Sequence, residues 1–250
     1  MKIKHLLCFI ALCLFFTPGK AQQLSVMTLR NGATVYIWED KSKPDVFGMI
    51  AFKVGSVDDP EQYTGLAHYL EHVMFKGTQT IDALDWEKEK PIYEKIIAKY
   101  DERAALSDPA AREAVDKEIN DLTREAAQYA AGNEFSLLVD HMGGQGLNAS
   151  TGYDQTEYHN SFPPSQLEKW LEIYSERLID PVFRGFQTEL EAVYEEYNMY
   201  NDDRGSRMRE FIYEQAFGDH PYARPIIGLP EHLKNPQLSK LIDFYNTWYG

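Results

Sequence analysis

Short stretches of alternating apolar and polar residues predict β-strands at the beginning of the chain. Residues 24–29 and 33–38 alternate in this way, and an Arg-Asn-Gly turn joins them. An Asn-Gly pair between two such stretches is a strong signal for a β-hairpin. Residues 46–54 form a longer, mostly apolar stretch and predict a third strand.

After these strands, apolar residues recur every three or four positions, which is the period of an α-helix with one buried face. This pattern predicts helices near residues 65–78, 167–178, 189–198, 204–216 and 239–248. A capping-box pattern precedes the second of these helices, whose predicted apolar stripe comprises Leu167, Trp170, Leu171, Tyr174 and Leu178. Three strands followed by helices predict an α+β fold, in which helices pack on one face of a mostly antiparallel sheet.

Residues 85–128 differ from the rest of the chain because they are dense in Glu, Lys, Ala and Arg. Ser107, Asp108 and Pro109 interrupt the helical pattern, and a proline suits the first turn of a second helix. We therefore predict an inserted helical hairpin at residues 85–128. A solvated hairpin that packs on the domain is the default interpretation, and an element that docks a partner or controls access to a site is the alternative.

The amino terminus has the composition of a secretory signal peptide at residues 1–21. Two lysines precede an apolar run at residues 6–16, and Gly19 and Ala21 form a small-x-small cleavage site. A membrane anchor is the alternative, but the run is too short to span a bilayer comfortably. Cleavage after Ala21 predicts an exported protein, periplasmic or secreted, without a stable membrane anchor.

Both cysteines, Cys8 and Cys13, fall within the predicted signal peptide. The exported chain would therefore contain no cysteine, which excludes cysteine nucleophiles and cysteine-ligated zinc. Removal of residues 1–21 takes away three lysines and changes the formal charge from −14 to −17. Such an acidic surface repels nucleic acid, and no basic run is present, so we expect no nucleic-acid partner.

The most informative residues are two histidines and a glutamate in the helix predicted at residues 65–78. His68 and His72 are four residues apart, so both imidazoles lie on one face and can bind a single ion. Glu71 lies where its carboxylate can reach a water molecule at the same ion without binding the ion itself. Two imidazoles plus a later carboxylate make a His₂Glu set with an open fourth position, which is typical of catalytic zinc.

A solvated helix face with two unrelated histidines is the alternative interpretation of this motif. The residues around the polar trio are mostly apolar, which predicts a largely buried helix. Buried polar side chains need partners, and a metal ion would supply one. The surroundings therefore favour the metal site.

The later carboxylate is expected in the glutamate-rich stretch 189–198. Glu189 and Glu196 are seven residues apart and line one flank of a helix, whereas Glu191 and Glu195 line the other. Spacing alone does not choose between these flanks, because a glutamate-rich helix is usually only solvated.

The helix that contains these histidines resembles the active-site helix of pitrilysin-type metallopeptidases, the M16 or inverzincin family. The resemblance extends from about residue 24 to the end of the chain, and several separate stretches match in order. It implies one Zn²⁺ per chain, bound by His68, His72 and Glu196, with Glu71 as the catalytic general base. It further implies that Glu189 supports the site from outside the ligand set, with Glu195 as the competing ligand. Mn²⁺ or Co²⁺ could occupy the same donors.

A further part of the resemblance covers residues 143–151, which include Asn148 and Ala149. From the residues alone, a glycine-rich turn that leads into a hairpin is the simplest interpretation. In the family this stretch is an edge strand beside the metal, to which a peptide backbone adds as an extra strand. The resemblance therefore implies that Asn148 and Ala149 bind the substrate.

The resemblance implies a zinc-dependent endopeptidase domain at residues 22–250 that hydrolyses peptides or unfolded polypeptide segments. It also implies that this domain is incomplete at its C-terminus and needs a second M16-like domain or subunit to close a chamber. The alternative is a non-catalytic or partner-dependent subunit that binds or scaffolds a second half, although such subunits usually lack one of the motif residues. A periplasmic zinc-storing protein is a third hypothesis, but it would not need Glu71 at its spacing.

Overall fold

The computed structural model describes residues 24–249, so the predicted signal peptide lies outside the described residues. The contacts between residues divide the chain into two units, Met1–Pro44 and Asp45–Gly250. In the first unit, β1 (Leu24–Thr28) pairs antiparallel with β2 (Thr34–Trp38). The turn between them uses Gly32 at φ +88°, a left-handed conformation that favours glycine. The predicted hairpin is therefore confirmed.

The second unit contains a three-stranded antiparallel sheet with the strand order β3-β5-β4. These strands are β3 (Val46–Phe52), β4 (Gln145–Thr151) and β5 (Thr156–Phe162). Along the central strand β5, buried residues alternate with partly exposed ones, as expected for a strand whose two faces differ. The strand β4 lies at one end of this sheet, so its outer edge has no strand partner among residues 24–249.

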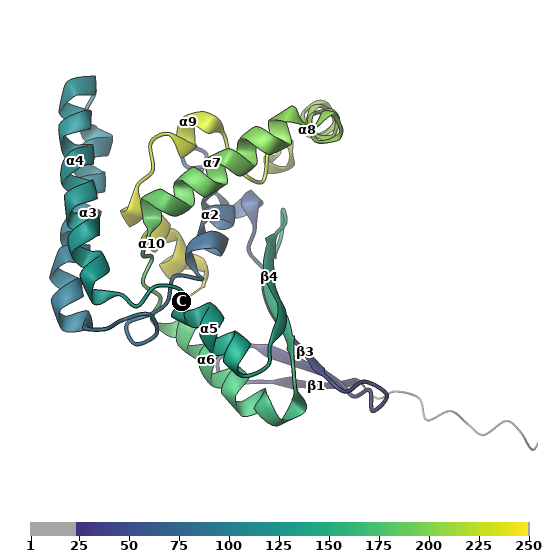
Figure 1. The fold of residues 1–250 in the computed structure, drawn as a ribbon. Helices are drawn as coiled ribbons and strands as arrows, with labels where there is room; N and C mark the ends of the chain where they lie inside the picture. The colour runs from purple at the N-terminus through teal and green to yellow at the C-terminus, as the bar shows by residue number, and fades with distance from the viewer. Residues whose placement is uncertain (1–23, 250) are drawn as a thin grey trace, which may run out of the picture. The chain divides into compact units, whose positions relative to one another are not determined.

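Helices α5 (Glu134–His141) and α6 (Leu167–Ile179) pack near this sheet (Figure 1). The ring of Trp170 on α6 stacks on Phe162 of β5 at a centroid distance of 5.1 Å. The same ring lies so close to β3 that a Cβ at Gly48 would be 2.6 Å from it, which explains the glycine there. Helices packed on an antiparallel sheet confirm the predicted α+β fold.

The predicted apolar stripe of α6 is only partly correct. Trp170 and Tyr174 are buried, but Leu167 and Leu171 are 44% and 48% exposed. The helix instead buries Trp170, Ile173, Tyr174 and Arg177, which recur at the spacing of one helical face. The predicted capping box is also wrong, since Gln166 is the N-cap residue and makes no capping hydrogen bond through its side chain.

Arg177 occupies this buried face because aromatic rings surround its guanidinium group. Its side chain is fully buried, and its Cζ atom lies 4.4 to 5.4 Å from the ring centroids of Phe75, Phe135, Tyr158 and Tyr174. Ring faces attract cations, which offsets part of the cost of burying the charge. These rings come from four separate segments, so Arg177 joins the sheet to α5, to α6 and to the segment after α2 (Leu66–Val73).

The charged insertion forms the predicted helical hairpin, with α3 (Trp86–Ala105) beside α4 (Pro109–Ala126) (Figure 1). Asp108 caps α4, because its carboxylate accepts a hydrogen bond of 3.1 Å from the backbone of Ala111. Glu89 on α3 forms two hydrogen bonds, of 2.6 and 2.8 Å, with the guanidinium of Arg184. Both side chains are nearly buried, so this ion pair attaches the hairpin to the rest of the unit.

The remaining helices of the unit follow α6 in the chain, and two of them, the first and the last, contact α2. They are α7 (Phe186–Asp202), α8 (Arg204–Phe217), α9 (Pro230–Leu233) and α10 (Leu238–Trp248). Figure 1 shows α2 between α7 and β4. Within residues 24–249, none of the helices combines the length and apolar character that crossing a bilayer requires.

Candidate metal centre

The start of α2 is held by a buried carboxylate and by a glycine. Asp59 accepts hydrogen bonds of 2.7 and 2.9 Å from the backbone N–H groups of Gly65 and Ala67. Burial raises the pKa of Asp59 to about 7, although these hydrogen bonds and Arg224 oppose the shift. Gly65 has φ +90°, and a Cβ there would lie 2.5 Å from the carbonyl oxygen of Ile227. These contacts hold the first turn of α2 in place immediately before His68.

The two histidines of α2 face one glutamate of α7. The Oε2 atom of Glu196 lies 3.6 Å from Nε2 of His68 and 3.4 Å from Nε2 of His72. One donor atom from each of the three residues lies within 4.8 Å of the other two. The structure therefore brings together the three residues that the family resemblance implies as ligands.

The chemistry of these donors fits a zinc ion. Two imidazole nitrogens and one carboxylate oxygen are a common catalytic zinc set, in which a fourth position stays open. Burial lowers the pKa of His68 to about 4, with His72 adding to the shift, so this imidazole is neutral and has a free lone pair at pH 7. The Nδ1 atom of His68 is buried and has no hydrogen-bond partner within the described part of the chain.

His72 has a different electrostatic environment from His68. Burial alone would lower its pKa, but Glu189 and Glu196 raise the pKa of His72 to about 9. Its Nδ1 atom faces Oε2 of Glu189 at 3.6 Å, while its Nε2 atom faces Glu196. A carboxylate on the far nitrogen of a histidine fixes the orientation of the ring toward a metal.

Glu189 also contacts Lys76, which follows α2 in the chain. Burial would raise the pKa of Glu189, but His72 and Lys76 hold it below its ordinary value. In contrast, Glu191 and Glu195 on the other flank of α7 are exposed. The structure therefore turns the flank of Glu189 and Glu196 toward α2, which spacing alone did not decide.

Glu71 lies beside the three donors but is not one of them. The hydroxyl of Thr151 donates a hydrogen bond of 2.5 Å to Oε2 of Glu71. Burial raises the pKa of Glu71, and the bond from Thr151 opposes this rise. A carboxylate that has a raised pKa and lies next to the donors of a metal site has the position and the basicity that a general base needs.

The candidate substrate-binding residues lie on the edge strand β4. Asn148 is exposed and opposite His159 of β5, whereas Ala149 is buried and opposite Tyr158. The ladder is irregular between Gln145 and Asn148, which is typical of strands beside functional sites. Thr151 at the end of β4 contacts Glu71, so this end of the strand lies beside the candidate metal centre.

Thr151 and Lys76 are not among the site residues predicted from the sequence. Lys76 is four residues after His72, which would place it near the same face if the helix continued. The helix ends at Val73, however, so only the structure shows that Lys76 reaches Glu189. The sequence feature that pointed to Thr151 is its position at the end of residues 143–151, the stretch that contains Asn148 and Ala149.

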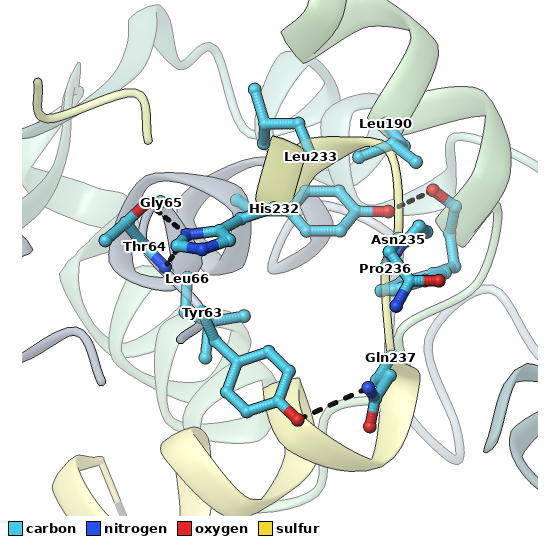
Figure 2. Close-up of a pocket in the computed structure, with 12 residues that line it drawn as sticks. Tyr63, Thr64, Gly65, Leu66, Leu190, His232, Leu233, Asn235, Pro236 and Gln237 are labelled. Atoms are coloured by element: carbon cyan, nitrogen blue, oxygen red, sulfur yellow. Dashed lines mark hydrogen bonds between the residues drawn. The ribbon is translucent and has the colours of Figure 1, made fainter. Parts of the chain in front are cut away.

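Two hollows lie near α2, and they differ in their relation to the donors. Figure 2 shows the first, where Tyr63 and Gln237 join by a 3.3 Å hydrogen bond and His232 contacts Thr64. Its volume of about 30 Å³ leaves room for only one or two water molecules, and it includes none of the metal donors. The second hollow, of about 370 Å³, is open and is lined by Glu196, Met199, Tyr200, Asp203 and Ser206. Only the second adjoins the candidate metal centre.

One family model matches the chain, and similar proteins are named as zinc proteases. The model of the insulinase family, peptidase family M16, matches residues 34–90 and 119–229. The chain is 25% identical over 227 residues to the zinc protease PqqE of Helicobacter pylori, covering 89% of this chain and 40% of that protein. It is 25% identical over 198 residues to an uncharacterised zinc protease of Mycobacterium leprae, covering 78% of this chain and 33% of that protein.

Solved structures share the fold. A protease from Helicobacter pylori superposes with a TM-score of 0.68 at 22% identity, over 92% of this chain and 44% of that one. The periplasmic protease PqqL from Escherichia coli gives a TM-score of 0.65 at 22% identity, over 92% of this chain and 21% of that one. The chain thus spans less than half the length of these relatives.

The inserted hairpin is also visible in the family comparison, because residues 91–118 lie between the two matched ranges. On both sides of this gap the match includes the candidate donors, His68 and His72 in the first range and Glu196 in the second. The matched ranges together make up about two thirds of the chain. This chain belongs to the insulinase family, peptidase family M16.

Proposed function

We propose that residues 22–250 form a zinc-dependent endopeptidase domain that hydrolyses peptides or unfolded polypeptide segments. The observation that carries this proposal is the convergence of His68, His72 and Glu196 within 4.8 Å, with Glu71 beside them. A storage site would need the three donors alone. A carboxylate next to them, outside the ligand set, supports catalysis.

His68, His72 and Glu196 would hold one Zn²⁺ per chain, although the same donors accept Mn²⁺ or Co²⁺. When bound, the ion would polarise the scissile carbonyl and lower the pKa of water. Glu71 would take a proton from the attacking water and then give it to the leaving amine. Thr151 would hold one oxygen of Glu71 through the hydrogen bond of 2.5 Å, leaving the other oxygen for this proton.

The edge strand β4 supplies the surface for the substrate backbone. A peptide that pairs with this edge would use main-chain hydrogen bonds around Asn148 and Ala149, which give affinity with little side-chain specificity. The hollow beside Glu196 could take one side chain of such a peptide, since Met199 and Tyr200 give it an apolar wall. Both features suit substrates that are already extended or unfolded.

Export and partnership are the other parts of the proposal. The signal-peptide pattern of residues 1–21 supports export to the periplasm, and one structural neighbour, PqqL, is described as a periplasmic protease. The chain spans 40% of its Helicobacter pylori relative PqqE, so a second M16-like domain or subunit is proposed to close the chamber. The proposed catalytic domain is residues 22–250, with the hairpin at residues 85–128 as its insertion.

Hydrolysis of a mixed quenched-peptide library by the zinc-loaded chain tests this function. Glu71→Gln keeps the size and polarity of the side chain but removes the base, so we expect the rate to fall by about 10²–10⁴-fold with one zinc retained. Equal rates in both proteins would contradict the role of Glu71. Zinc binding without cleavage in the wild type would favour the alternative, a non-catalytic or partner-dependent subunit.

A further inference from the structure

Lys76 lies just beyond the helix that carries both histidines. Its ammonium group contacts Oε1 of Glu189, and Oε2 of the same carboxylate lies 3.6 Å from Nδ1 of His72. One carboxylate thus bridges a lysine and a candidate ligand. The side chain of Glu189 is only 15% exposed, so these contacts are partly shielded from water.

We propose that Lys76 is a positioning residue that holds Glu189 against His72 and thereby sets the orientation of this imidazole for zinc. The inference rests on the metal site of the proposed function. It assigns to Lys76 no contact with the substrate, because its ammonium acts through Glu189.

The backbone around Lys76 is fixed from several directions, which makes it suitable for this role. Its carbonyl oxygen accepts a hydrogen bond of 3.3 Å from Arg184, whose guanidinium is also paired with Glu89 on α3. The next residue, Gly77, accepts a hydrogen bond of 3.1 Å from the backbone of Val182. The Cα atom of Lys76 is therefore held in place, so only the torsions of its side chain have to be ordered when its ammonium pairs with Glu189.

The charges at the centre also call for a cation at this position. Glu71, Glu189 and Glu196 place three carboxylates around two imidazoles. A divalent ion would neutralise two of these charges, and Lys76 would neutralise the third. Without Lys76, the carboxylate of Glu189 would lose one of the two side chains that hold it and could turn to solvent, which would leave His72 without its support.

Zinc affinity of the metal-free chain, measured by competition with a chromophoric chelator, tests the inference without any assay of hydrolysis. Lys76→Met should weaken zinc binding by about 10–100-fold, the range for loss of a group that orients a ligand. Lys76→Arg keeps the charge and should stay within about threefold of the wild type. Lys88→Met is the matched control, because Lys88 pairs with Asp85 at the surface and should leave the affinity unchanged.

A double-mutant cycle with Glu189→Gln separates positioning from a general effect on folding. If Lys76 acts through Glu189, then Lys76→Met should add little to the loss that Glu189→Gln already causes. Additive losses, or equal zinc affinity of Lys76→Met and the wild type, would overturn the inference alone. Absence of zinc binding in the wild type would overturn the proposed metal centre, and this inference with it.

Discussion

Two groups of acidic side chains in this protein share their chemistry and differ in their surroundings. On the hairpin, Glu118 and Asp116 are 56% and 42% exposed, and each pairs with a cation of α3. On α7, Glu189 and Glu196 are 15% and 26% exposed and face the imidazoles of α2. A pair in open water gains little, because water screens the charges and the long side chains lose freedom.

The difference teaches that the content of glutamate in a helix does not reveal its function. The sequence predicts both α4 of the hairpin and α7 as charged helices, but of these two only α7 turns two carboxylates toward histidine ring nitrogens of another helix. Burial and facing partners convert an ordinary acidic flank into a candidate metal site. Changes at the two regions should therefore have very different consequences.

Loss of the buried ion pair that attaches the hairpin should have the largest effect. Arg184→Met leaves Glu89 buried without its partner, and breaking such a pair costs about 3–5 kcal/mol. We expect the midpoint of urea unfolding to fall accordingly, since both side chains are nearly buried in the wild type. A midpoint equal to that of the wild type would show that the hairpin is not held by this pair.

Exchange of single carboxylates on α7 should separate its two flanks. Glu196→Gln should weaken zinc binding by more than about 100-fold, which exceeds the range for loss of an outer supporting group. Glu195→Gln is the matched control on the exposed flank and should bind zinc as the wild type does. Equal losses in the two variants would remove the distinction between the flanks.

The pH dependence of zinc binding should reflect the raised pKa of His72. In the metal-free chain this pKa is about 9, so His72 carries a proton at pH 7 that zinc must displace. We expect the apparent affinity to rise by up to about tenfold, or 1.4 kcal/mol, per pH unit between pH 6.5 and 8.5. His68, with a pKa of about 4, is already neutral there and adds no slope. Isothermal titration at three pH values would measure this slope, and a flat profile would contradict it.

The same shift has a consequence for the stability of the metal-free chain. A histidine whose pKa rises from 6.5 to about 9 on folding contributes stability below pH 6.5, and this contribution is lost between pH 6.5 and 9. His68 acts in the opposite direction, because its contribution is lost as the pH falls from 6.5 to about 4. Urea unfolding of His72→Gln should therefore lack the loss at alkaline pH that the metal-free wild type shows.

Removal of a surface pair on the hairpin should have the smallest effect. Lys99 pairs with Glu118 at 2.6 Å, but both side chains are in contact with water. Lys99→Met should leave the unfolding midpoint and the zinc affinity close to those of the wild type. A marked loss of zinc affinity would mean that the hairpin influences the metal centre, and the contrast between the two regions would fail.

Local periodicity accounts for what the sequence could predict. The spacing of His68 and His72 is sufficient because the geometry of a single helix fixes their common face. Likewise, the Asn-Gly turn and the Asp108-Pro109 break predicted the β-hairpin and the helical hairpin, which the structure confirms. These features need no knowledge of distant parts of the chain.

Predictions failed or stayed open where the answer depends on how two elements pack. The flank of α7 that faces α2 is set by their relative rotation, so spacing could not choose Glu196 over Glu195. The prediction for α6 placed Leu167 and Leu171 on its buried face, but both are exposed. Arg177 lies on the buried face instead, among aromatic rings, which the charge of this residue did not suggest. The contact of Lys76 with Glu189 joins a turn to a helix more than a hundred residues later.

A crystal structure of the zinc-soaked chain with anomalous scattering measured at the zinc edge would test the proposed metal centre most directly. We expect one peak in contact with Nε2 of His68, Nε2 of His72 and a carboxylate oxygen of Glu196, at about 2.0–2.2 Å from each. Glu189 should remain on the far side of His72, without contact to the peak. No peak at this position, or a peak that Glu189 or Glu195 binds in place of Glu196, would contradict the assignment.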